Sequence, residues 1–113
     1  MELPREIEDE LRGAREAEVE GNQGKSRVCA RRAVGKAFVL SKLFPRTSPY
    51  ISATQCLREI SNSANLPSEM RAAATRLAAS VAYDGGKSVS TTPIEDALLV
   101  IAKLLGTDDT IRR

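Results

Sequence analysis

The amino-acid sequence predicts an all-α fold, an up-down antiparallel bundle of about five helices. Apolar residues recur at helical spacing through five segments, proline marks four of the expected helix starts, and strand-like alternation of useful length is absent. The connections between the segments are short, which favours antiparallel neighbours. The 113 residues suit one domain, which we expect to span residues 1–106, followed by a flexible C-terminal tail over residues 107–113.

The first two helices are predicted on either side of a tight turn. The first begins at Pro4 and ends near Glu20, with three apolar residues on one face, Ile7, Leu11 and Ala14. The turn over residues 21–24 contains glycines that can adopt positive φ. The second helix spans residues 24–44, ends before Pro45, and has the widest apolar arc: Cys29, Ala30, Ala33, Val34, Ala37, Phe38, Leu40 and Phe44. We therefore expect it at the centre of the bundle.

Two further helices follow in the middle of the chain. Ser48 as N-cap and Pro49 at the first helical position open the third helix. Its apolar seam consists of Tyr50, Ala53, Leu57, Ile60 and Ala64. Pro67 opens the fourth helix, which is expected to end at residues 84–86. Its apolar face consists of Met70, Ala73, Ala74, Leu77, Ala78 and Val81.

The fifth helix has the most specific start signal. Thr92 and Glu95 match a T-x-x-E capping box around a proline at the first helical position. Glu95 and Asp96 in the first turn are explained by the helix macrodipole. The residues expected to face inward are Ile94, Ala97, Leu98, Ile101 and Leu105, and Gly106 suits the C-terminal cap.

The composition excludes several kinds of site. The chain contains no His, so a Ser-His-Asp triad, a Cys-His pair and a His general base are all excluded within it. Cys29 and Cys56 lack the further ligands that zinc requires and are expected to be reduced, buried thiols. No apolar run approaches the ~20 residues that span a bilayer, and residues 1–10 lack an apolar signal stretch. We therefore expect a cytoplasmic protein with no membrane partner, no cofactor, no metal and no enzymatic activity.

The net charge of +2 conceals an uneven distribution. Residues 1–20 hold eight acids and three bases, whereas residues 21–58 hold eight bases and no acid. Five of these bases on the second helix are the candidate anion-binding residues: Lys25, Arg27, Arg31, Arg32 and Lys36. Together with Lys42, they are placed by helical spacing in two stripes beside the apolar arc, one with Lys25, Arg32 and Lys36, the other with Arg27, Arg31 and Lys42.

Three interpretations of these stripes remain open. The acidic first helix can pack against the second, so that one stripe pairs with Glu16, Glu18 or Glu20. The stripes can also bind phosphates of a nucleotide or RNA, for which the planar guanidinium of arginine is suited. A surface for a partner protein is the third interpretation.

A possible phosphate-binding loop occurs at the start of the second helix. Gly24-Lys25-Ser26 matches the end of a P-loop, but Val19 stands where the first glycine is needed, and a helix rather than a strand precedes it. A nucleotide-hydrolysing P-loop is therefore excluded. Free N–H groups at the helix start are a candidate for binding one phosphate, and a simple helix–helix turn is the alternative.

The segment Gly24-Lys25-Ser26-Arg27-Val28-Cys29-Ala30-Arg31-Arg32-Ala33, between an acidic amphipathic helix and a long alanine-rich one, resembles the HEPN superfamily of small all-helical domains. The resemblance covers mainly residues 7–44 and the five-helix plan. It implies a dimeric module that binds a nucleotide, RNA or a nucleotidyltransferase partner. Active HEPN ribonucleases use an arginine followed by histidine, so the absence of His implies the non-nuclease branch. The alternative is a structural protein–protein interaction domain, a homodimer without a ligand.

Overall fold

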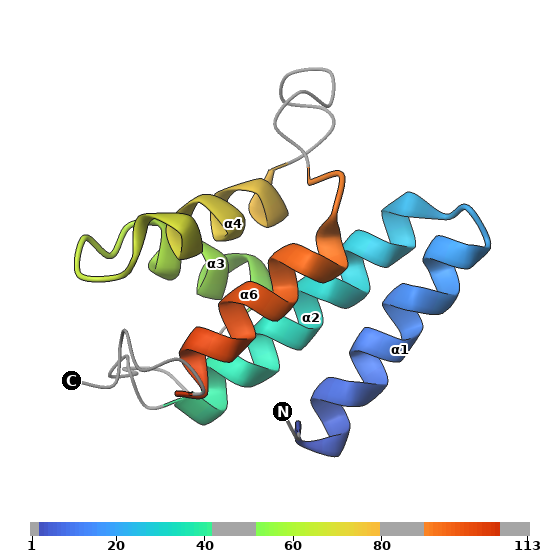
Figure 1. The fold of residues 1–113 in the computed structure, drawn as a ribbon, viewed down its shortest axis with the longest axis horizontal. Helices are drawn as coiled ribbons and strands as arrows, with labels where there is room; N and C mark the ends of the chain where they lie inside the picture. Colours follow the sequence, from blue (N-terminus) through green and yellow to red (C-terminus); the bar gives the residue numbers. More distant parts are fainter. Residues whose placement is uncertain (1–2, 42–51, 80–89, 107–113) are drawn as a thin grey trace.

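The structure, a computed structural model, describes residues 3–41, 52–79 and 90–106, which contain no strand. The helices in these ranges are α1 (Arg5–Val19), α2 (Gln23–Ser41), α3 (Ala53–Ser61), α4 (Ser68–Ala78) and α6 (Pro93–Leu104). The all-α bundle predicted from the sequence is thus confirmed. α1 and α2 form an antiparallel hairpin, while α6 lies alongside α2 and runs in the same direction (Figure 1). Within the described ranges, no helix has both the length and the apolar character needed to cross a membrane.

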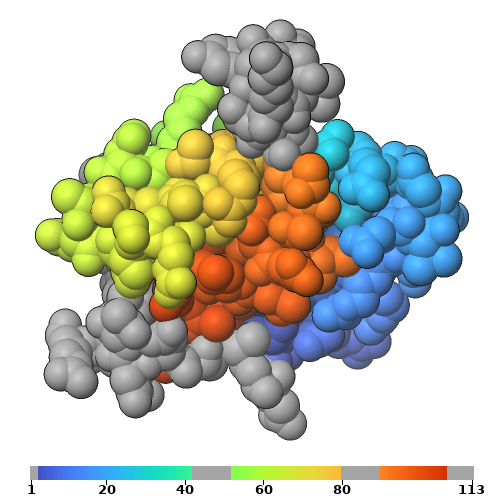
Figure 2. Space-filling model, turned by 45° about the horizontal axis from the view of Figure 1, so that its top comes forward, coloured from blue at the N-terminus to red at the C-terminus, as the bar shows by residue number. Residues whose placement is uncertain are grey.

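α2 is the central helix, as predicted, and packs against all the other described helices. Its buried residues are mostly small: Ser26, Cys29, Ala30, Ala33, Val34, Ala37 and Phe38. α2 approaches α3 closely at Gly35, because a Cβ added to this glycine would lie only 3.2 Å from Ala53 Cβ. α6 covers one side of the core between α4 and α1 (Figure 2). The predicted burial of Leu40 is wrong, since its side chain is 44% exposed at the end of α2; Phe44 lies outside the described residues.

The connection between α1 and α2 is very short and fixes their register. Gly21 adopts a positive φ of 80°, as its place in the predicted turn allows. Its N–H donates to the Glu18 carbonyl at 3.0 Å, and the Asn22 N–H donates to the Ala17 carbonyl at 2.8 Å, which together close the end of α1. Asn22, the residue before α2, caps the start of that helix, because its Oδ1 accepts a hydrogen bond from the Lys25 N–H at 3.0 Å. The second glycine of the predicted turn lies inside α2.

α3 is shorter than the sequence predicts. Ser52 has an extended backbone (φ −77°, ψ 160°), and its Oγ accepts a hydrogen bond from the Gln55 N–H at 3.1 Å. Ser52 is therefore the N-cap of α3. The prediction that one helix runs continuously from Pro49 is wrong, because Ser52 is not helical. Ser48 and Pro49 themselves lie outside the described residues. The helix ends at Ser61, which leaves Ala64 exposed rather than in the apolar seam.

The ends of α4 and α6 correct two further expectations. Ala79 has an extended ψ of 148°, so α4 ends at Ala78 instead of continuing toward residues 84–86, which lie outside the described ranges together with Val81. α6 begins at Pro93 as predicted, but the Thr92 hydroxyl makes no capping hydrogen bond. Gly106, with φ 74°, caps the C-terminal end of α6 as predicted.

A polar cluster around the buried Asp96 side chain takes the place of the predicted capping box. Ser90 Oγ accepts from the Thr92 N–H at 3.2 Å and donates to Asp96 Oδ2 at 2.6 Å. Arg76 pairs with the same carboxylate through two bonds of 2.7 and 3.1 Å, and this hydrogen bonding raises the pKa of Arg76. The Asp96 side chain is only 6% exposed. Asp96 therefore joins α4 to α6, a role beyond the macrodipole effect expected from its position.

We expect Ala33→Leu to destabilise the fold, because Ala33 is completely buried on the central helix. Overpacking of a close helix contact costs about 1–3 kcal/mol. Thermal or urea unfolding measures this loss. The matched control is Ala72→Leu, which adds the same atoms to an exposed position on α4. Equal unfolding midpoints for the two variants would contradict the central packing of α2.

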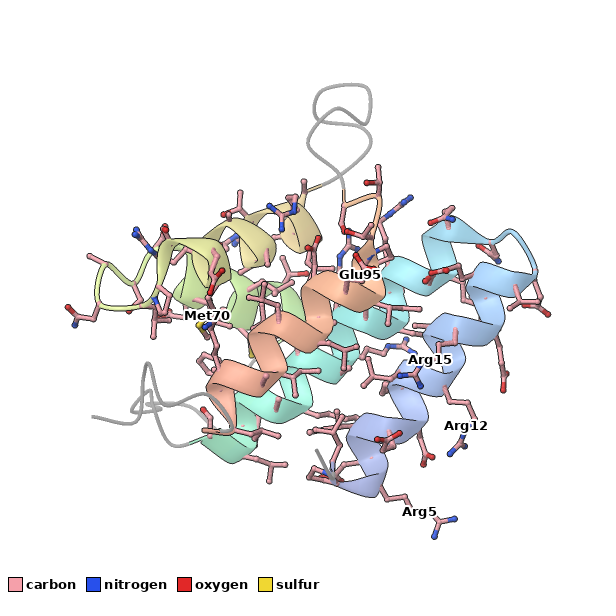
Figure 3. All side chains as sticks on the ribbon, viewed as in Figure 1. Arg5, Arg12, Arg15, Met70 and Glu95 are labelled. Carbon is pink, nitrogen blue, oxygen red and sulfur yellow. The ribbon has the colours of Figure 1, made fainter. Side chains whose placement is uncertain are left out.

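Replacement of Asp96 by alanine is expected to lower the free energy of unfolding by about 1.5–3 kcal/mol, the range for hydrogen bonds to charged groups. The change leaves the buried Ser90 hydroxyl without its acceptor. Glu95→Ala is the control, since Glu95 is exposed in the same turn of α6 (Figure 3). A larger loss for the Glu95 variant would show that the macrodipole, rather than the cluster, governs this helix start.

Candidate anion-binding site

The two basic stripes of α2 face different neighbours. In the first stripe, Lys36 Nζ lies 3.0 Å from Glu10 Oε2 of α1. In the second, the Arg31 guanidinium donates to the carbonyl oxygens of Leu77 and Ala79 at the end of α4. The two stripes therefore lie in different environments, one beside α1 and the other beside the end of α4.

The first stripe is only partly neutralised by α1. Lys36 is paired with an acid, whereas the exposed side chains of Lys25 and Arg32 make no ion pair or hydrogen bond within the described ranges. The partner of Lys36 is Glu10, not one of the three acids expected from the sequence, Glu16, Glu18 and Glu20. The short hairpin connection explains this difference, because it places the end of α1 opposite the first turns of α2 rather than opposite Lys36.

Arg31 caps another helix. Its Nε donates to the Leu77 carbonyl, and its Nη2 donates to the Ala79 carbonyl at 3.0 Å. The last carbonyl groups of a helix have no partners within the helix and carry the negative end of its dipole. Arg31 satisfies two carbonyls at this end, just where Ala79 leaves helical geometry. No sequence motif marks this contact, because both acceptors belong to the backbone.

Arg27 and Arg31 form a pair of like charges one helical turn apart. Partial burial, and then the charge of Arg27, lower the pKa of Arg31. Among the described residues, no carboxylate opposes these two effects on the pKa of Arg31. Arg27 is half-buried and forms no ion pair or hydrogen bond with the described residues. The geometry thus provides a guanidinium held by two carbonyls beside a second guanidinium, an arrangement that can bind an oxyanion.

The other candidates from the sequence are structural. Ser26 is fully buried in α2, and the Lys25 N–H is bonded to Asn22, so the P-loop-like tripeptide belongs to a capped helix. Cys29 and Cys56 are buried and form no disulfide, as predicted, and Cys29 packs against Gly13 of α1. Within the described ranges, no three His, Cys, Asp or Glu residues are grouped so as to hold a metal ion.

Comparison with known proteins found no match for this chain. No protein-family model, curated protein or solved structure matches the chain. The resemblance to HEPN domains therefore rests on the segment over residues 24–33 and on the helical plan.

Arg31→Gln is expected to lower the free energy of unfolding by about 1.5–3 kcal/mol, because charged hydrogen bonds at the end of α4 are lost. Arg27→Gln is the matched control, since it removes the same charge from the same stripe without removing a bond to the described residues. Chemical unfolding of both variants measures the difference. If they unfold at the same denaturant concentration, Arg31 does not cap α4 in solution.

Proposed function

We propose that this protein is a non-catalytic, HEPN-like helical module that binds phosphate groups of a nucleotide or RNA through Arg27 and Arg31 of α2. The observation that supports the proposal is the pair of neighbouring guanidinium groups: burial and the charge of Arg27 both lower the pKa of Arg31, and no carboxylate among the described residues offsets them. A bound phosphate is the chemistry that would offset both effects.

Three physical effects favour a phosphate at this position. Like charges four residues apart on a helix repel by about 0.2–0.5 kcal/mol, and a phosphate between them reverses that interaction. Arg27 lies near the N-terminal end of α2, where the helix dipole favours negative charge. Arg31 is already held in place by the Leu77 and Ala79 carbonyls, which reduces the entropy lost when it binds a ligand.

The proposal concerns binding alone. The chain contains no His to act as a general base, and no catalytic role is proposed for Arg27 or Arg31. Lys25, also near the start of α2, adds positive charge that attracts a polyanion over a longer distance. The HEPN resemblance also makes a nucleotidyltransferase a candidate partner, which a pull-down with the same variants would test.

Arg27→Gln is expected to weaken binding of ATP and of a short single-stranded RNA by about tenfold or more, which corresponds to a loss of ~1.4 kcal/mol. Isothermal titration calorimetry with ATP and fluorescence anisotropy with labelled RNA measure the two affinities. Lys36→Gln is the matched control, because its charge already pairs with Glu10. Thermal unfolding of each variant confirms that the fold is retained.

Repeating the same titrations at several salt concentrations distinguishes RNA from ATP as the ligand and also tests the proposal itself. An RNA backbone engages several phosphates, so its affinity should fall more steeply with salt than that of ATP. The proposal is wrong if the parent protein binds neither ligand, or if Lys36→Gln weakens binding as much as Arg27→Gln does.

A further inference from the structure

A groove of about 400 Å³ runs along α2 between α1 and the beginning of α3. Gly35 and Ala53 lie in it, and its other lining residues are two acids of α1 and four residues of α2: Glu6, Glu10, Arg32, Lys36, Val39 and Leu40. Val39 and Leu40 are 41% and 44% exposed, although they belong to the central helix of the bundle. The groove therefore combines adjacent exposed apolar side chains with charges of both signs.

The charges follow a definite order along the groove. The ion pair between Glu10 and Lys36 joins α1 to α2 in its middle. Because the two helices are antiparallel, Glu6 and Arg32 lie on opposite sides of this pair, each displaced by four residues, or about 6 Å along its helix. Neither Glu6 nor Arg32 forms an ion pair within the described ranges. One end of the groove is thus acidic and the other basic.

The acidic end is suited to an arginine side chain. Glu6 lies toward the end of the groove that contains Val39 and Leu40, since the start of α1 is opposite the end of α2. An arginine stem packs on apolar surface while its guanidinium pairs with a carboxylate. The chain itself carries an unpaired arginine, Arg32, at the other end of the same groove.

We infer that the groove is the contact surface of a two-fold symmetric dimer of this chain. A two-fold axis that lies in the interface plane and crosses the groove above the ion pair between Glu10 and Lys36 brings Arg32 of each copy onto Val39 and Leu40 of the other, with its guanidinium beside Glu6. An interface of this kind requires a self-complementary surface, and a groove with one acidic and one basic end has that property. The charge order thus selects a second copy of the chain as the occupant.

The dimer is expected to be weak and sensitive to salt. Eight residues line the groove, whereas a standard stable interface contains about 20–30 residues on each side. Its two new ion pairs lie at the surface and are screened by added salt. Arg27 and Arg31 do not line the groove, so the dimer and the proposed phosphate site can fail independently.

A charge-reversal experiment tests the dimer. Arg32→Glu and Glu6→Arg each place like charges together at both ends of the two-fold interface, so each variant alone should dimerise at least tenfold more weakly than the parent protein. In a 1:1 mixture of the two variants, each end again contains one glutamate and one arginine, and dimers should return. Sedimentation velocity at low salt, over a wide range of protein concentration, measures all four samples.

Arg5→Glu is the control, since it makes the same charge change as Arg32→Glu on a side chain that projects away from the bundle (Figure 3). Circular dichroism of each variant verifies that the helices are retained. The inference is overturned if the parent protein is monomeric at every concentration, if neither single variant weakens the dimer, or if the mixture stays monomeric.

Discussion

The close approach of the other described helices to α2 is the constraint on which the rest of the structure depends. It requires small side chains, and α2 supplies them: Ala30, Ala33 and Ala37 are completely buried, while Gly35 admits the first turn of α3. Packing at this density leaves no room for a charged side chain on the inner face. The bases of α2 are therefore confined to the boundaries between its neighbours, and those boundaries differ chemically.

Residues of the same type thus acquire different properties from their surroundings. Lys36 faces a full carboxylate on α1, which neutralises it. Arg31 faces two backbone carbonyls at the end of α4, which hold the guanidinium in position but carry only the partial charge of a helix end, equivalent to about half an elementary charge. Positive charge therefore persists beside Arg31, and Arg27 adds to it. For this reason the stripe that faces α4 is a better candidate for an anion than the stripe that faces α1.

Features determined by local chemistry could be predicted from the sequence, and those determined by distant contacts could not. Periodicity predicted each of the described helices, and glycine predicted the positive φ at Gly21 and Gly106. The end of α4 is capped by Arg31, which lies forty-six positions before Leu77 in the sequence. No local sequence pattern predicts a contact between residues so far apart. The start of α6 depends on a buried Asp96 bonded to Ser90 and Arg76, although a complete capping box stands at the same place in the sequence. The candidate anion-binding residues were predicted as a set, but their division between two environments required the structure.

Leu40 shows how a failed prediction of burial can itself be informative. Helical spacing places Leu40 in the apolar arc of α2, yet no described neighbour closes over the end of that arc, and the side chain stays 44% exposed beside Val39. An exposed ion pair contributes only about 0.2–1 kcal/mol, so the charges at Glu6 and Arg32 do not bind a partner strongly by themselves. Burial of apolar surface contributes about 25 cal/mol per Å², and Val39 and Leu40 provide that surface in the same groove. Affinity would then come from the apolar residues, while the order of the charges determines which partner fits and in which orientation.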